Sequence, residues 1–140
     1  MEPGDIHSYH AHIYYDPATT RDRAARLRGL IDERFAVQIG NWHDEAVGPH
    51  PVSMYQVVFA VEDFPRFVPW LMLQRDGLTV LVHPNTHRPR DDHMIYPLWL
   101  GAVLPLVGEA VPEAMDRPHD PLLPNTQFAR VRPAATRGKT

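Results

Sequence analysis

Histidines are the residues of this chain whose type and spacing could do chemistry. The 140 residues include nine histidines and no cysteine. Neutral imidazoles are good ligands for Fe, Zn, Cu and Ni, whereas Mg and Ca prefer oxygen. The lack of cysteine excludes disulfides, zinc fingers, iron–sulfur clusters and thiol catalysis. Four histidines stand out by context: the His-x-His pair His10 and His12, His50 in the GPHP tetrapeptide 48–51, and His83 before Pro84.

Four strands and two helices are predicted to position these side chains. Aromatic and β-branched residues favour strands, and apolar residues at helical spacing favour an amphipathic helix. The predicted strands are 9–15, 35–42, 52–61 and 78–82. One helix follows Asp16-Pro17 and a second runs from Asp63 to Gly77, with Pro69 inside it indicating a separate first turn or a kink. The order βαββαβ predicts an α+β, ferredoxin-like domain with both helices on one face of an antiparallel sheet.

The predicted fold gathers the histidines. Strand side chains alternate, so His10 and His12 share one face, which we expect to be the face that the helices leave open. We expect the first and third strands to be parallel neighbours and the fourth to run antiparallel beside the first. That arrangement puts His50 and His83 at the same edge, with His43 near them. Taken singly, His50 and His83 are more simply turn residues; taken with the pair, a shared metal site is favoured.

Other candidates have equally good structural interpretations. His93, in the Asp91-Asp92-His93 run, is either an acid/base or outer-sphere residue or part of a polar loop. Gln56 is either a substrate or oxygen contact or a dimer-interface hydrogen-bonding group. Tyr14 and Arg75 are further substrate candidates, although packing and a solvated helix end explain them as well. Hydrolase GxSxG, P-loop and GxGxxG motifs are absent from the sequence.

Composition limits the remaining possibilities. The net charge of −3, with scattered Lys and Arg, gives no basic stripe for nucleic acid or an anionic membrane. The start of the sequence, 1–5, is acidic and polar, so we expect no signal peptide, and no apolar run of the sequence is long enough to span a bilayer, so we expect a cytoplasmic protein. Residues 1–110 are predicted to form the domain and 111–140 an irregular, Pro-rich C-terminal tail.

Several motifs, taken together, resemble the DOPA 4,5-dioxygenase family. They are YHAHIYY at 9–15, GPHP at 48–51 with MYQ at 54–56, WLMLQR at 70–75, LVHP at 81–84, Asp92-His93 and WLG at 99–101. The resemblance spans roughly residues 7–106 in the same order. The chain departs from the family pattern at Ser53 and at 85–91 (NTHRPRD), where an extra histidine and basic residues replace a more acidic loop. The loop change bears on the identity of the substrate rather than on metal binding.

The resemblance implies an extradiol catechol dioxygenase that uses O2 and non-haem Fe(II), with Zn as another divalent ion that could occupy the site. Carried over, His10, His12, His50 and His83 would form the metal site and His93 would be a candidate acid/base. The sequence does not decide which three of the four are ligands; our prediction is His12, His50 and His83, with His10 beside them as a catalytic residue. On the residues alone, Gln56, Tyr14 and Arg75 stay the predicted substrate contacts. The alternatives are a metal-free dimeric binding module, a cofactor-independent oxygenase and a Zn-dependent enzyme. We expect a homodimer formed through the open sheet face, unless the C-terminal tail or residues 96–106 cover that face within the chain.

Overall fold

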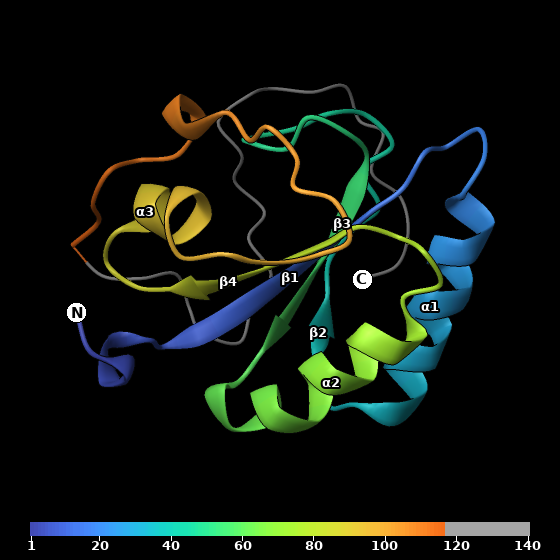
Figure 1. Cartoon of the computed structure of the whole chain (residues 1–140), viewed down its shortest axis with the longest axis horizontal. Coiled ribbons are helices and arrows are strands. Elements are labelled where there is room, and N and C mark those ends of the chain that lie inside the picture. The colour runs from blue at the N-terminus through green and yellow to red at the C-terminus, as the bar shows by residue number, and fades with distance from the viewer. Residues whose placement is uncertain (117–140) are drawn as a thin grey trace.

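A computed structural model describes residues 1–116, which form an α+β domain around one five-stranded antiparallel sheet (Figure 1). The strand order is β2-β3-β1-β4-β5. The strands are β1 (Ser8–Tyr14), β2 (Gln38–Ile39), β3 (Met54–Phe59), β4 (Val80–Asn85) and β5 (Leu98–Leu100). The helices are α1 (Arg21–Arg34), α2 (Phe64–Gln74) and α3 (Pro89–Met94), with single 3-10 turns at Pro3–Asp5, Val61–Asp63 and Gly108–Ala110. The first four strands and two helices have the predicted ferredoxin-like order.

The boundaries of several elements differ from the prediction for local reasons. The α1 helix begins at Arg21 rather than next to Pro17, because Asp16 closes a turn of its own. The backbone carbonyl of Asp16 accepts from the N–H of Thr20, and its carboxylate accepts from the N–H of Ala18. The separate turn expected before the second helix is present at Val61–Asp63. The predicted strand at 35–42 shortens to the two residues of β2, whereas β4 continues past Val82 to Asn85.

The direction of β3 corrects one prediction. The β1 and β3 strands are neighbours but antiparallel, with His12 opposite Gln56 and Tyr14 opposite Met54. The crossover through α1 makes β2 parallel to β1, and β3 lies between them, antiparallel to both. His50, just before β3, therefore enters the sheet near the end of β1, not near its start. The predicted common edge is wrong, and His50 must reach the other histidines by a different path.

The main core lies between the sheet and helices α1 and α2, which both cover one face (Figure 1). The odd-numbered β1 residues Ala11 and Ile13 are fully buried against it, as are Leu71 of α2 and Ile31 of α1. The alternation of β1 is therefore as predicted, with its even-numbered side chains turned to the other face. That other face carries the histidines.

The face away from α1 and α2 is not left bare. After β5 the chain returns across it, and Trp99, Leu104 and Leu106 pack on a second apolar cluster that contains Tyr14 and Leu81. The covering expected as the alternative to dimerisation is thus provided in part by the chain itself. The open face no longer supplies a reason for a homodimer, and the oligomeric state stays a prediction.

Two further predictions concern the C-terminal tail and the location of the protein in the cell. Residues 111–116 contain no helix or strand, and residues 117–140 of the predicted tail, with His119, lie outside the described residues. Within residues 1–116, none of the helices combines the length and the apolar character that a bilayer crossing requires. The cytoplasmic location stays a prediction.

Candidate metal centre

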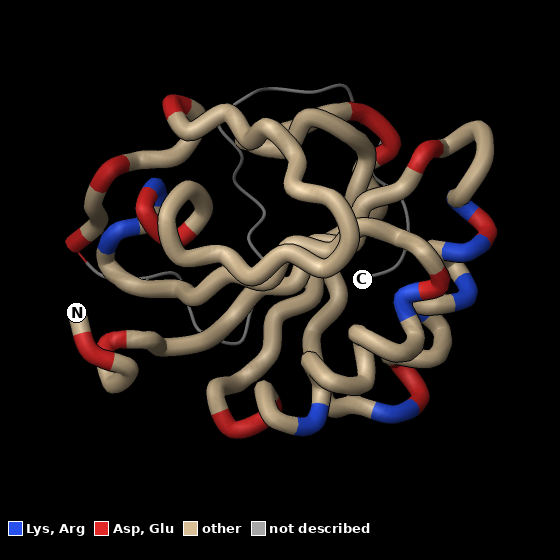
Figure 2. The backbone as a smooth tube through the Cα atoms, in the orientation of Figure 1, with Lys and Arg blue, Asp and Glu red and all other residues tan. Residues whose placement is uncertain are grey.

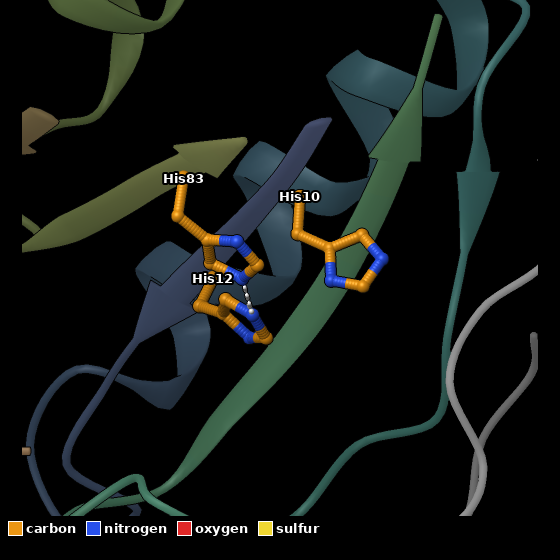
Figure 3. Close-up of side chains that lie close together, drawn as sticks. All are labelled: His10, His12 and His83. Carbon is orange, nitrogen blue, oxygen red and sulfur yellow. Dashed lines mark hydrogen bonds between the residues drawn. The ribbon is translucent and has the colours of Figure 1, made fainter. Parts of the chain in front are cut away.

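Five histidines from four segments meet on the face opposite α1 and α2. His10 and His12 come from β1, and His83 of β4 lies directly across from His10 in the strand register (Figure 3). His50 comes from the loop before β3 and His93 from α3. His12 and His83 are at most 1% exposed, and His10 and His50 are 3% exposed. The register of two neighbouring strands, rather than a shared edge, places the first three side by side.

Backbone contacts bring His50 over the sheet. The loop turns back on itself at the bridge between Val47 and His50, and the N–H of Val107 donates to the Pro49 carbonyl at 2.9 Å. The His50 and His12 ring centroids are 4.1 Å apart as a result. The covering segment thus also fixes the loop that carries His50.

A buried carboxylate holds α3, and with it His93. Asp92 is 1% exposed and accepts two 2.7 Å hydrogen bonds from Thr86, one from its N–H and one from its hydroxyl. Thr86 directly follows β4, so this pair ties the first turns of α3 to the end of the strand that carries His83. The ring centroids of His83 and His93 are 3.9 Å apart.

The nitrogen atoms form two groups that could each hold a metal ion. One group is His10, His12 and His83, and the other is His12, His50 and His93. Within each group the candidate ligand atoms lie within 4.8 Å of one another. His12 belongs to both groups, so it is central to either arrangement. The three predicted ligands, His12, His50 and His83, are divided between the two groups.

Hydrogen-bond partners decide which ring nitrogens carry protons. Nδ1 of His83 lies 2.8 Å from the Pro84 carbonyl, and Nδ1 of His93 lies 2.7 Å from the Pro89 carbonyl. Carbonyl oxygens only accept, so both Nδ1 atoms must donate, and a neutral ring then has its lone pair on Nε2. Nδ1 of His12 faces the Met54 sulfur, a weak acceptor, at 3.4 Å.

The same assignment leaves the Nε2 lone pair of His83 facing His12. Nε2 of His12 lies 3.2 Å from Nε2 of His83 (Figure 3). Because His83 has its proton on Nδ1, its Nε2 can accept a hydrogen bond from Nε2–H of His12. When the His12 proton lies on Nδ1, toward the weak acceptor Met54, the two Nε2 lone pairs can share a cation instead. Two nitrogens bound to one ion at about 2.1 Å are separated by about 3.2 Å when the angle at the ion is near 100°. The donor set therefore fits a divalent metal ion of the kind that imidazoles bind.

Burial keeps these rings neutral. Desolvation, followed by repulsion from the neighbouring histidines, lowers the pKa of His12, His50 and His83 well below the usual value. Metal binding needs the unprotonated ring, so a cluster with depressed pKa values is ready to bind at neutral pH. Burial also raises the pKa of the Tyr14 phenol, which stays protonated.

Comparisons with known proteins agree on one family. Residues 9–110 match the model of the Dopa 4,5-dioxygenase family. The chain belongs to this family. It is 33% identical over 110 residues to the DOPA 4,5-dioxygenase of Amanita muscaria, covering 73% of this chain and 48% of that protein. It is 36% identical over 111 residues to an uncharacterised 21.2 kDa protein of Botryotinia fuckeliana, covering 73% of this chain and 59% of that protein.

A solved structure supports both the family and the fold. A protein of Nostoc punctiforme, provisionally described as a dioxygenase, matches with a TM-score of 0.76 and 50% identity, over 78% of this chain and 94% of that one. The chain spans only about half to three-fifths of the length of the two fungal relatives. The histidine cluster of the described residues could bind a metal ion.

Of the three predicted substrate residues, two lie beside the histidine cluster and one does not. The Tyr14 hydroxyl lies 2.6 Å from Nδ1 of His50, and the Gln56 amide nitrogen lies 3.3 Å from Nδ1 of His10, so both are beside the cluster. Arg75 ends α2 and donates to the Leu78 carbonyl, on the side of the sheet that the helices cover. The structure does not bring Arg75 to the histidines.

Three residues of the centre were not predicted. Met54 faces His12, and the Asp92–Thr86 pair fixes α3. The α3 helix itself could have been found, because Pro89 stands in its first turn with Asp91 and Asp92 next to it, which is the usual signature of a helix start. The contact with Met54 depends on strand register, and no local signal predicts it.

The Asp92–Thr86 pair leads to a stability prediction. Asp92→Asn is expected to reduce the free energy of unfolding by about 1–3 kcal/mol, because the amide NH2 replaces one of the two acceptor oxygens that Thr86 needs. Urea unfolding measures the change. Asp91→Asn is the matched control, because Asp91 makes only a 3.4 Å surface ion pair with Arg88, worth about 0–1 kcal/mol. Equal losses in the two variants would contradict a special role for Asp92.

Proposed function

We propose that this chain is an extradiol-type dioxygenase that opens the aromatic ring of a catechol with O2, using Fe(II) held by the histidine cluster. The observation that carries the proposal is the buried histidine cluster, in which two groups of three histidines each bring their candidate ligand atoms within 4.8 Å of one another and Nε2 of His12 lies 3.2 Å from Nε2 of His83. Membership in a dioxygenase family supports the choice of oxygen chemistry for this centre. DOPA or a related dihydroxyphenyl compound is the proposed substrate class, after the description of the Amanita relative.

His12, His50 and His83 are the proposed ligands. Three protein ligands would leave coordination positions of the metal ion open. Bound iron would supply binding positions for the catechol oxygens and for O2, and it would lower the pKa of the phenol groups. The cluster offers no carboxylate among its candidate ligands in the described residues. Neutral ligands leave the full charge of the ion available to an anionic substrate.

His93 is the proposed acid/base. Its Nδ1–H is held by the Pro89 carbonyl, so its Nε2 is the nitrogen that can accept a proton from the catechol and later return it. His93 is also less buried than the other four rings, and it comes from a short helix rather than from the sheet. His10 is a second candidate, with its Nδ1 side turned to Gln56.

Tyr14 and Gln56 are proposed to act on these histidines as well as on substrate. The Tyr14 hydroxyl orients the His50 ring, and the Gln56 amide orients the His10 ring. The ring of Tyr14 stacks on Trp99 at 6.1 Å, and together they give the cluster an aromatic side suited to a flat substrate.

Metal content and ring cleavage test the proposal together. The full chain, purified without a histidine tag, is expected to bind about one Fe(II) per chain under anaerobic conditions. Addition of a catechol and O2 is then expected to give a yellow ring-opened product, with one O2 consumed per product. His7→Ala is the control, because His7 is exposed and lies outside both groups.

The competing functions predict other results. The dioxygenase mechanism is wrong if no metal binds and if alanine at His12, His50 or His83 leaves the activity unchanged. Ring cleavage that a chelator does not inhibit would favour a cofactor-independent oxygenase. Stoichiometric Zn with no oxygen consumption would favour a Zn-dependent enzyme.

A further inference from the structure

The sheet edge at β5 carries an apolar surface that the proposed reaction does not use. Residues 94–108 contain no charged residue and no histidine, although 22% of the chain is charged. Figure 2 shows the charges spread over α1, α3 and the loops, with none along this stretch. Four of its side chains are exposed next to the edge: Met94 (46%), Ile95 (64%), Tyr96 (48%) and Leu98 (39%). We call these four residues the edge strip.

The edge strip lies beside a hollow. A cavity of about 380 Å³ lies next to the strip, on the helix side of β4 and β5. Tyr96 and Leu98 of the strip form part of its wall, together with Tyr9, Phe64, Val82 and Pro84. Glu2 is the one charged residue among the described residues that line it. A protruding apolar side chain and an apolar hollow therefore stand next to each other on the same surface.

The position of the strip at the end of the sheet adds a second feature. Among the described strands, β5 is last in the order and pairs with β4 alone. Edge strands offer backbone N–H and C=O groups to another strand, and proteins usually protect them with charged residues, especially lysine. The run 94–108 provides no such charge.

We infer that the edge strip is the surface through which two copies of this chain form a dimer. In a twofold interface the same surface of each copy faces the other. A charged side chain near the axis would therefore lie close to the identical charge of the partner copy, and an uncharged strip avoids this repulsion. An antiparallel strand edge is self-complementary, since β5 of one copy can pair with β5 of another. The hollow receives the protruding residues, foremost Ile95, of the partner copy. The inference does not depend on the proposed reaction, because none of the five clustered histidines belongs to the strip.

Mass in solution tests the inference. The full chain is expected to have twice the 16.0 kDa of one chain by light scattering across a concentration series. Ile95→Lys and, separately, Leu98→Lys are expected to weaken the dimer at least roughly tenfold, because each puts a charge into an apolar interface. Both side chains are exposed in the single chain, so the variants are expected to keep the wild-type circular dichroism, while their melting temperature loses the concentration dependence that dimer formation gives the wild type.

A matched control separates the strip from general surface effects. Leu73 on α2 is 83% exposed and far from β5 in sequence, and Leu73→Lys is expected to leave the dimer unchanged. Hydrogen exchange gives an independent readout, since the backbone amides of β5 are expected to exchange more slowly in the dimer than in the Ile95→Lys chain. A single-chain mass at all concentrations would overturn the inference. So would a dimer that survives both strip variants, or one that Leu73→Lys weakens equally.

Discussion

His12→Ala is expected to abolish both metal binding and ring cleavage. His12 is the one residue shared by the two histidine groups, so its loss leaves only two candidate ligands in each. Loss of an outer-shell partner alone typically costs a metal site about 10–100-fold in affinity, and loss of the shared ligand should cost more. The Fe(II) stoichiometry is expected to fall to the background of a metal-free sample, and oxygen uptake with it.

Two further alanine variants decide which group holds the metal. His10→Ala removes a member of the first group only, and His93→Ala removes a member of the second only. Neither variant removes a ligand of the proposed set His12, His50 and His83, so retention of the ion by both is expected, with His93→Ala losing catalysis. If the metal instead lies in the first group, His10→Ala loses the ion and His93→Ala keeps it. The reverse result would place the metal in the second group. Retention of a full equivalent of Fe(II) by His12→Ala would contradict both arrangements.

The alternation of strand side chains is what made the site predictable from sequence. His10 and His12 are two residues apart in a strand whose odd-numbered residues are apolar, and this pattern alone puts both rings on the face opposite the helices. His83 follows the same logic, because Val80 and Val82 face the core. The choice of histidines that gather was therefore correct for His10, His12, His50 and His83.

The way in which they gather was less predictable. The pairing of His10 with His83 is a matter of register, which depends on the whole sheet and not on either strand. His50 was assigned to a common edge through a wrong strand direction, and it reaches His12 only because a segment more than fifty residues later binds its loop. Long-range contacts of this kind leave no periodic signal in a single sequence.

Acidification is expected to destabilise the metal-free protein steeply. In the unfolded chain each histidine has a pKa of about 6.5, whereas the folded structure lowers the pKa of His12, His50 and His83 well below that value through burial and mutual repulsion. Below about pH 6.5 the unfolded chain therefore binds protons that the folded chain does not. The free energy of unfolding then falls as the pH falls, because stability rises with pH wherever the unfolded state holds more protons.

The size of this effect follows from the number of buried rings. Each ring contributes about 1.4 kcal/mol per pH unit once the unfolded chain is protonated, so three rings give a slope of about 4 kcal/mol per pH unit. Urea unfolding of the metal-free chain between about pH 7.5 and about pH 5 measures the slope. His50→Gln is expected to reduce it by about 1.4 kcal/mol per pH unit, and His7→Gln, at an exposed position, to leave it unchanged.

Bound metal is expected to raise the free energy of unfolding at neutral pH, and this gain distinguishes a cluster of metal ligands from a cluster of histidines that is only buried. Fe(II) binds the neutral rings of the folded state, so a saturating ion adds stability that grows with the ratio of free metal to its dissociation constant. Acidification then weakens the site by protonating the unfolded chain and by unfolding the protein that binds the ion. A flat stability profile from about pH 7 to about pH 5, with or without metal, would mean that the folded rings take up protons as easily as the unfolded ones. The fold would then not keep the rings of His12, His50 and His83 in the neutral form that metal binding needs, and the proposed metal centre would be contradicted.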